Sequence, residues 1–453
     1  MGVLAALQRT GGVWFGWSGE TSAEPRTEPE VLARDNIRFA TVELETAEFE
    51  RYYNGFCNST LWPLCHYALS RFRYDYEEYE SYQRVNAQFA RQLAPLLRPD
   101  DVIWVHDYHL IPLARYLRQQ QFTGPIGFFL HIPFPHVQVL RVLPSYAELI
   151  RDLCQYDLVG FQTDDDLRSF ESCLDAPGAV RVANGSRLEI GGRSVRLGVY
   201  PIGVDVDSVG TEATATMGEE TVQRLTQSLL GRKLIIGVDR LDYSKGLAER
   251  FAAFEHFLTR FPDSLGRVTF LQIAPLSRAD VHAYGEIRRA LEQTAGQING
   301  RFAEADWTPI RYLNRNFLHA TLMGFMRAAQ VALITPVRDG MNLVAKEFVA
   351  AQDPQDPGVL ILSPLAGAAR ELSGALLVNP YDKPGMALAL QTALTMPLAE
   401  RRQRHEQMLD SVRRHDIHNW YRRFLHDLTG ERLVVAGEPL SFKLPSRGAG
   451  GRS

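Results

Sequence analysis

The chain has 453 residues, 45% of them hydrophobic and 23% charged, and its 49 basic and 53 acidic residues leave a formal charge of −4 at pH 7. This is the balance of a globular protein with two or three domains, and it argues against a nucleic-acid binder that works through bulk charge. No apolar run approaches the ~18 residues that cross a bilayer, and four cysteines without a C-x-x-C pair indicate reduced thiols, so we expect a cytoplasmic protein that contacts no membrane.

The first part of the chain reads as a doubly wound α/β domain. It opens with a helical pattern, GVLAALQRT, that ends at Gly11-Gly12 before VWFGW. Continuous apolar runs follow, typical of parallel strands covered on both faces: VIWVHD (102–107), IGFFLHIPFP (126–135), DLVGFQT (157–163) and LGVYPIG (197–203). Such domains usually begin with a strand and a tight turn, for which this sequence has no residues before Gly11. We therefore predict a domain over 1–210 whose first strand is missing, which would leave an edge or gap in its sheet.

A second set of strands predicts a second domain of the same kind. Its apolar runs are KLIIGVDR (233–240), VTFLQIAP (268–275), IRYL (310–313), VALITP (331–336), VLILS (359–363) and ALLVNP (375–380). Between the first two, residues 247–261 place leucines and phenylalanines on one helical face. We expect the break between domains near 208–231, in one Thr/Glu/Gln-rich helix. The predicted units are 1–210, 211–410, a C-terminal helix over 411–430 that packs back on the first domain, and a mobile tail over 431–453.

Ligands bind open α/β sheets at the carboxyl ends of strands, so residues just after strands are the candidates. Arg240 and Lys245, in VDRLDYSKG, follow a buried strand and precede a helix that begins near Gly246. Two cations beside a helix N-terminus suit a diphosphate. The alternative is a solvated loop in which they pair with Asp239 and Asp242.

The segment TPVRDGMNLVAKE (335–347) is a second candidate. Its helix starts near Asn342, and backbone N–H groups at such a start bind phosphate or sugar oxygens. Asp339 suits sugar hydroxyls and Glu347 a ribose diol. The alternative is helix capping by Asp339 or Asn342.

Candidates in the first domain are less specific. HDYH (106–109) suggests a metal weakly; strand-end residues that contact substrate or cap the next helix are the stronger interpretation, and we predict no metal site. His131, in LHIPFP, is aimed by two prolines, but taken alone a buried core histidine is the better interpretation. Tyr53 and Trp62 suit stacking on a sugar, although such residues are more often core. Arg278 follows another strand, in APLSRAD.

Together these motifs resemble trehalose-6-phosphate synthases of the bacterial type over about residues 1–430. The resemblance rests on WFGWSGE (14–20), LWP and HY (61–67), WVHDYHL (104–110), GFFLHIPFP (127–135), GFQT (160–163), VYPIG (199–203), RLDYSKG (240–246), APLSR (274–278), INGRF (298–302) and RDGMNLVAKE (338–347), in the family's order and spacing.

The resemblance implies a GT-B fold, with two Rossmann-like domains facing across a cleft, and transfer of glucose from UDP-glucose to glucose 6-phosphate with retention. By motif match, Arg240 and Lys245 would hold the donor diphosphate and Glu347 the ribose, with Phe317 near the uracil. The rest of the donor set is Asp339, Met341, Asn342, Leu343, Val344, Ala345 and Lys346. On the acceptor side, Tyr53 and Arg278 would bind the 6-phosphate, while Trp62 and Asp107 would contact the sugar.

The resemblance also implies the chemistry. His131 would touch the transferred glucose, and with Asp339, Arg240 and Lys245 it forms the predicted catalytic set. A double-displacement enzyme needs a carboxylate nucleophile, usually with an acid partner, and the sequence nominates no such pair. The family is thought to react on one face, with the leaving phosphate taking the acceptor proton. Catalysis then rests on positioning and on stabilising the diphosphate, without metal or cofactor.

The start of the chain leaves alternatives open. The family has a first strand and an N-terminal loop that this sequence lacks, so either the start lies further upstream or activity is impaired. The rivals are a sister enzyme such as glucosylglycerol-phosphate synthase, and a catalytically silent homologue that binds sugar phosphates. We expect small-molecule substrates, no nucleic-acid partner and a separate trehalose-6-phosphate phosphatase downstream; homo-oligomer formation and the donor base are left open.

Overall fold

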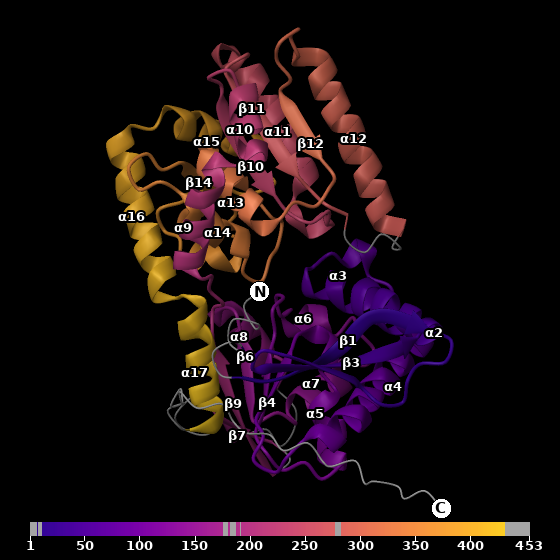
Figure 1. The fold of residues 1–453 in the computed structure, drawn as a ribbon. Coiled ribbons are helices and arrows are strands. Elements are labelled where there is room, and N and C mark those ends of the chain that lie inside the picture. The colour runs from indigo at the N-terminus through magenta and orange to yellow at the C-terminus, as the bar shows by residue number, and fades with distance from the viewer. Residues whose placement is uncertain are drawn as a thin grey trace, which may run out of the picture.

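The computed structural model describes residues 7, 11–174, 180–181, 187–190, 192–276 and 282–430. The predicted tail over 431–453 and Arg278 lie outside the described residues. The described chain forms two lobes, each built on a mostly parallel sheet with helices on its faces, so the predicted two-domain α/β architecture is confirmed (Figure 1).

All of the strands predicted from apolar runs are present. The strands are β1 (Gly12–Ser22), β2 (Glu30–Arg34), β3 (Ile37–Glu45), β4 (Ile103–His106), β5 (Ile126–Phe129), β6 (Leu158–Phe161), β7 (Val180–Arg181), β8 (Arg187–Ile190), β9 (Arg193–Val199), β10 (Lys233–Val238), β11 (Val268–Ile273), β12 (Ile310–Leu313), β13 (Val331–Ile334), β14 (Val359–Leu362) and β15 (Leu376–Leu377).

Helices cover these sheets. They are α2 (Thr46–Phe49), α3 (Trp62–Cys65), α4 (Tyr76–Leu93), α5 (Leu113–Gln119), α6 (Val137–Leu140), α7 (Tyr146–Leu153), α8 (Asp164–Glu171), α9 (Val206–Ala215), α10 (Glu220–Ser228), α11 (Leu247–Arg260), α12 (His282–Phe302), α13 (His319–Ala328), α14 (Leu343–Ala351), α15 (Lys383–Thr395), α16 (Leu398–Arg414) and α17 (Ile417–Thr429). A π-helical stretch, η1 (Glu50–Leu61), precedes α3. Short 3₁₀ turns are η2 (Leu69–Arg71), η3 (Ala94–Leu96), η4 (Tyr108–Leu110), η5 (Thr216–Gly218), η6 (Tyr243–Lys245), η7 (Pro262–Ser264) and η8 (Gly367–Arg370).

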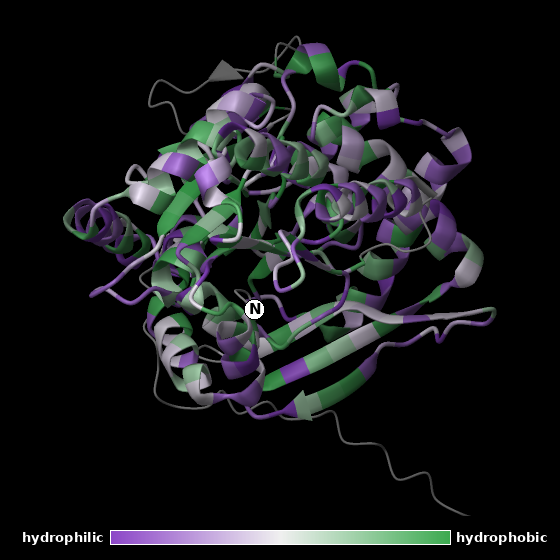
Figure 2. Ribbon diagram, turned by 90° about the horizontal axis from the view of Figure 1, so that it is seen from above, coloured by the Kyte–Doolittle hydropathy of each residue, from purple (hydrophilic) through white to green (hydrophobic). Residues whose placement is uncertain are grey.

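The strand order places the candidate loops together. The first sheet runs β4-β5-β6-β9-β8-β7 and the second runs β12-β11-β10-β13-β14-β15. In the second sheet the chain proceeds outward from β10 to β12, then returns to pair β13 with the other side of β10. The order therefore reverses between β10 and β13, which is where open α/β sheets bind ligands. The side chains of β5, β6, β10, β11, β13 and β14 are almost all buried, whereas those of β4 are mainly half-buried. In Figure 2 the strands inside the molecule are mainly green, while the surrounding helices mix green and purple.

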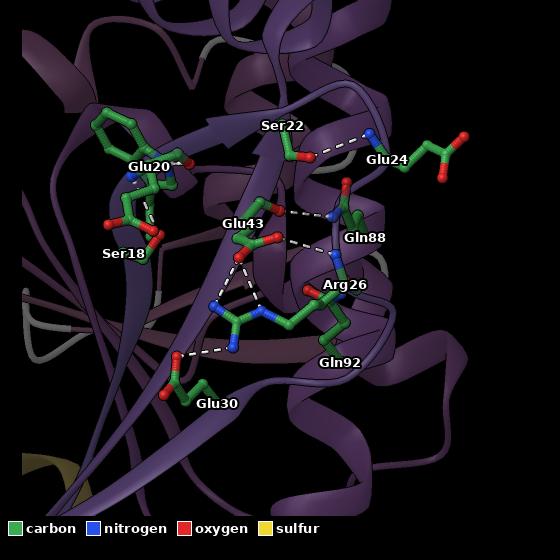
Figure 3. Close-up of polar contacts among 10 residues, drawn as sticks. Ser18, Glu20, Ser22, Glu24, Arg26, Glu30, Glu43, Gln88 and Gln92 are labelled. Atoms are coloured by element: carbon green, nitrogen blue, oxygen red, sulfur yellow. Dashed lines mark hydrogen bonds and ion pairs between the residues drawn. The ribbon is translucent and has the colours of Figure 1, made fainter.

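The first three strands form a small sheet that the apolar-run criterion did not predict. Its order is β1-β3-β2, separate from the six-stranded sheet, in which β4 occupies an edge. Strand β2 is exposed along its whole length, so it carries no apolar signal. It is held by antiparallel pairing with β3, from Glu30 opposite Thr41 to Arg34 opposite Ile37. Before this strand, Arg26 donates from Nε to Glu43 Oε1 (2.8 Å) and from Nη1 to Glu30 Oε2 (2.8 Å), as Figure 3 shows. Gln88 and Gln92 of α4 donate to backbone oxygens of the same region.

The prediction of one continuous helix between the domains is wrong. The segment forms α9, the 3₁₀ turn η5 and α10. Thr216 follows the last residue of α9; its hydroxyl lies 2.8 Å from Glu212 O and 3.2 Å from Ala320 O, and Gly218 lies in the turn that follows. Helix α9 packs on the second sheet's helices, with Val206, Val209 and Ala213 in their apolar core.

The last described helix returns to the first lobe. In Figure 1, α16 runs beside the second lobe and α17 beside β6 and β9. Phe424 stacks on Trp104 of β4 (4.5 Å between ring centroids), and Tyr200 donates to Asp427 Oδ2 (2.8 Å). Glycines 127 and 160 make room, because a Cβ at either would lie 2.7 Å from the Phe424 ring. The C-terminal segment therefore ties the two lobes together.

Two further findings bear on the composition. All four cysteines are buried and none forms a disulfide, as predicted. Among the helices of the described ranges, none is long and apolar enough to cross a membrane.

Candidate active site

The two predicted donor segments meet at the point where the strand order reverses. Lys245, after β10, places Nζ 2.5 Å from Oδ2 of Asp339, after β13, although 94 residues separate them. Asn342 Nδ2 donates to the same oxygen (3.0 Å). Both partners of the ion pair are largely buried, with side chains 12% and 14% exposed. The site therefore holds a fixed carboxylate between an ammonium and an amide.

Gly246 allows this approach. It has φ 66°, a left-handed conformation that favours glycine, and a Cβ there would lie 2.3 Å from Thr335 O. The predicted helix start is confirmed, because α11 begins at Leu247. The loop carrying Lys245 thus packs directly against the end of β13.

Arg240 is exposed, and the alternative pairing with Asp239 and Asp242 is wrong. Asp239 is instead buried in an ion pair with Arg250 (2.7 Å), and Asp242 caps η6 by accepting from Ser244 N (2.9 Å). The guanidinium of Arg240 lies over the Trp62 ring, 5.5 Å from its centroid. In the described ranges no carboxylate lies within ion-pair distance of Arg240, so its charge is available to an anionic ligand.

The segment after β13 combines capping with an open helix start. Asn342 has φ 79° and caps α14 by accepting from Ala345 N (3.1 Å), so the capping alternative holds for Asn342; Asp339 is occupied by Lys245 instead. Met341 is buried, while Leu343 and Val344 are half-buried. Lys346 points elsewhere: its Nζ is fully buried between Ile202 O (2.7 Å) and Glu371 (3.0 Å). Its side chain fastens α14 to the segment after β9.

The loops of the two lobes touch at Gly340. A Cβ at this glycine would lie 2.2 Å from the carbonyl oxygen of His131, which follows β5. Cation–π contacts cross the same boundary: besides Arg240 over Trp62, Arg338 lies 3.9 Å from the centroid of Tyr67. The carboxyl ends of both sheets therefore face one another at van der Waals distance.

His131 belongs to a neutral histidine pair. His106 Nδ1 lies 3.1 Å from His131 Nε2, and burial lowers the pKa of both rings. Uncharged rings share one hydrogen between these nitrogens, which fixes their orientation. Asp107 Oδ1 accepts from His131 N at a long 3.3 Å. Asp107 itself has φ 73° and ψ 165°, a conformation that costs a non-glycine residue about 1–3 kcal/mol and is typical of functional sites.

The two aromatic candidates, Trp62 and Tyr53, differ in how deeply their side chains are buried. Trp62 is 4% exposed and packs on His66 (4.1 Å between ring centroids) and Tyr108 (5.9 Å). Tyr53 is half-buried and stacks on His109 (5.4 Å), which belongs to the same loop as Asp107. Both belong to the η1–α3 segment, so one irregular helix presents them beside the loop after β4.

His66 predicts an acid-sensitive fold. Burial lowers its pKa from 6.5 to about 4, so it is neutral in the folded protein but takes up a proton on unfolding below pH 6.5. Since the unfolded chain then binds more protons, stability falls as the pH falls through this window, by about 2 kcal/mol between about pH 7.5 and about pH 5 from this group.

We expect His66→Asn to remove that part of the acid sensitivity, because an amide can replace the ring nitrogen that contacts Trp62 O (2.8 Å) and does not titrate. Urea unfolding of both proteins at the two pH values measures it. The buried pair His106 and His131 contributes equally to the acid sensitivity of the native protein and of the variant. An unchanged difference between the pH values would contradict the assignment to His66.

At the far end of the donor segment, Glu347 contacts a histidine that sequence reasoning missed. His319, the first residue of α13, places Nε2 3.4 Å from Glu347 Oε1 and Nδ1 2.8 Å from Glu212 Oε2. Phe317, two residues earlier, packs edge-on against Phe325 (5.3 Å) under Arg315.

The structure thus brings together most predicted site residues. Lys245, Asp339 and Asn342 are in contact, as are His131 and Asp107; Gly340 touches His131, and Arg240 covers Trp62. The roles given to these residues stay predictions. His106 was visible in HDYH but was assigned no role, whereas nothing in the sequence marks His319. Among the described residues no group of three or more His, Cys, Asp and Glu is arranged to hold a metal ion.

Comparisons with known proteins agree with this geometry. A family model described as glycosyltransferase family 20 matches residues 2–430. A trehalose-6-phosphate synthase of Sinorhizobium fredii is 50% identical over 427 residues, which cover 94% of this chain and 92% of the relative. A crystal structure of a UDP-forming α,α-trehalose-phosphate synthase from Burkholderia xenovorans in complex with glucose-6-phosphate is 51% identical, with a TM-score of 0.92, covering 95% of this chain and 96% of that one. An E. coli structure bound with UDP-2-fluoro glucose is 47% identical, with a TM-score of 0.91 and 94% of each chain covered.

Proposed function

Because the chain belongs to glycosyltransferase family 20, we propose that it transfers glucose from UDP-glucose to glucose 6-phosphate, giving α,α-trehalose 6-phosphate and UDP with retention of configuration. The observation that carries the proposal is the contact between the two candidate loops, where Gly340 of the donor segment meets the His131 carbonyl of the first lobe. A donor held after β10 and β13 then lies against an acceptor held after β4.

The second lobe holds the donor. Arg240, exposed and without a carboxylate partner in the described chain, and Lys245 bind the diphosphate. The N–H groups at the start of α14 add to them, since a helix N-terminus favours anions. As the bond from the anomeric carbon to the phosphate oxygen breaks, negative charge grows on the diphosphate. Fixed cations there stabilise the transition state more than the ground state.

The first lobe holds the acceptor. Trp62 and Asp107 contact its sugar, and Tyr53 and Arg278 bind its 6-phosphate. The acceptor's O1 forms the new bond to the anomeric carbon, and its proton passes to the departing phosphate oxygen on the same face. Asp339, whose Oδ2 is already held by Lys245 and Asn342, suits hydrogen bonds to sugar hydroxyls better than attack on carbon. The neutral His131 orients the transferred glucose through hydrogen bonding.

Steady-state UDP release tests the proposal. We expect release from UDP-glucose that depends on glucose 6-phosphate, with glycerol 3-phosphate a poor acceptor. Preference for glycerol 3-phosphate would favour a sister synthase instead. Binding of UDP-glucose without turnover, with ADP-glucose and GDP-glucose also silent, would indicate a sugar-phosphate-binding homologue. We also propose a cytoplasmic location, because four buried cysteines that form no disulfide suit a reducing compartment.

A further inference from the structure

His319 lies between two carboxylates from different helices. Its Nδ1 is 2.8 Å from Glu212 Oε2 on α9, and its Nε2 is 3.4 Å from Glu347 Oε1 on α14. A neutral imidazole has one N–H, so it can donate to only one of them, whereas an imidazolium donates to both. The geometry alone therefore favours the charged ring.

The surroundings explain why the charge is retained. His319 begins α13, and a cation at a helix N-terminus is disfavoured by the helix dipole. The hydrogen bonds with Glu347 and Glu212 outweigh that effect and partial burial, and they raise the pKa of His319 to about 9. Glu212 and Glu347 are the charged groups that act on the ring. The shorter contact, with Glu212, fixes the orientation of the ring, and in this orientation the other ring nitrogen faces Glu347.

Glu347 is held on one side only. Its Oε1 faces His319, while in the part of the chain that the structure describes no side chain forms a hydrogen bond or ion pair with Oε2. The carboxylate is 19% exposed, and α14 places it at the end of the donor segment. One oxygen is thus fixed by the imidazolium and the other is left to accept from a ligand hydroxyl.

We propose that His319 is a positioning residue for nucleotide recognition, holding the Glu347 carboxylate in the orientation that grips the ribose hydroxyls. The proposal rests on the function proposed above. Glu212, from the helix that leads into the second lobe, fixes His319 in turn. His319 acts through Glu347 and therefore matters only to ligands that carry those hydroxyls.

Calorimetric titration with UDP and with 2′,3′-dideoxy-UDP tests this dependence. We expect His319→Ala to weaken the binding of UDP about tenfold and that of dideoxy-UDP less than about twofold. The second ligand has no ribose hydroxyl that could donate a hydrogen bond to Glu347. His319→Arg should restore most of the UDP affinity, since a guanidinium can donate to both carboxylates. His256→Ala, at a half-buried histidine of α11, is the matched control and should change neither ligand.

A purely structural role gives a different pattern. If His319 only stabilised the fold, His319→Ala would weaken both nucleotides equally, and that outcome would overturn the inference. In turnover, the alanine variant should raise KM for UDP-glucose about tenfold while kcat and KM for glucose 6-phosphate change little. A fall in kcat with an unchanged KM for UDP-glucose would equally contradict it.

The pH profile supplies a second readout. UDP binding by the native protein should weaken as the pH rises past about 9, because the imidazolium then loses its proton. The Arg variant keeps its charge, and the uracil ionises identically with both proteins, so the difference between them isolates His319. Identical profiles would overturn the inference. A native protein that binds no UDP would instead refute the proposed function, and this inference with it.

Discussion

Replacing Arg240 by alanine is expected to lower kcat/KM about 1,000-fold, because the variant loses a fixed cation where charge develops on the leaving diphosphate. The fold should hardly change. Arg240 is exposed, and its contact over the Trp62 ring is worth about 0.5–1 kcal/mol at an exposed site. Initial rates of UDP release and a thermal unfolding curve on the same preparation measure both effects.

Two further variants serve as controls for this prediction. Arg240→Lys keeps the charge but not the planar fork, so it should retain intermediate activity. Arg260→Ala removes an exposed arginine from the end of α11 and should leave turnover unchanged. Native-like kinetics in Arg240→Ala would rule out the diphosphate role; loss of activity matched by a large fall in Tm would show that Arg240 acts through the fold.

Gly340→Ala is expected to lower kcat about 100-fold through geometry alone. The added Cβ would lie 2.2 Å from His131 O and 3.0 Å from Ile132 Cα, both backbone atoms, so one loop must move. A shift of about 1 Å between reacting groups costs on the order of 100-fold in rate. The overpacking should also cost about 1–3 kcal/mol of stability. Initial rates with both substrates saturating, and urea unfolding, measure the two effects.

The matched control is Gly296→Ala, in α12, where an added Cβ meets nothing within 4 Å. It should leave activity unchanged and raise stability slightly, since alanine is the better helix former. If Gly340→Ala retained full kcat, the two lobes would not need their present approach for catalysis, and the proposed placement of the two substrates would be wrong.

The sequence could predict the sheets because their strands are buried on both faces. Runs such as KLIIGV and VTFLQI have no other stable location, and β10 and β11 lie where those runs predict. The small sheet escaped because β2 is wholly exposed and is held by backbone pairing with β3, which leaves no buried apolar run in the sequence. The break at η5 escaped because Thr216 bonds to Ala320, a contact 104 residues away.

The site was predictable where a motif follows a strand directly. Arg240, Lys245 and Asp339 were found in this way, but their partners were not. Local spacing suggested pairing with Asp239 and Asp242, whereas the fold brings Asp339 to Lys245 and gives Asp239 to Arg250. His319 is the clearest case, because its two carboxylates lie 107 and 28 residues away in sequence. Only the packing of α9, α13 and α14 brings them together.

The product's configuration tests the central claim most directly, namely that donor and acceptor meet on one face between the two lobes. UDP-glucose that carries ¹³C at the anomeric carbon of its glucose would react with unlabelled glucose 6-phosphate, and NMR would follow the label during turnover. The account predicts one labelled product, α,α-trehalose 6-phosphate, formed in step with UDP and α-configured from the first spectrum. A β-configured linkage, or labelled free glucose released with UDP, would contradict it.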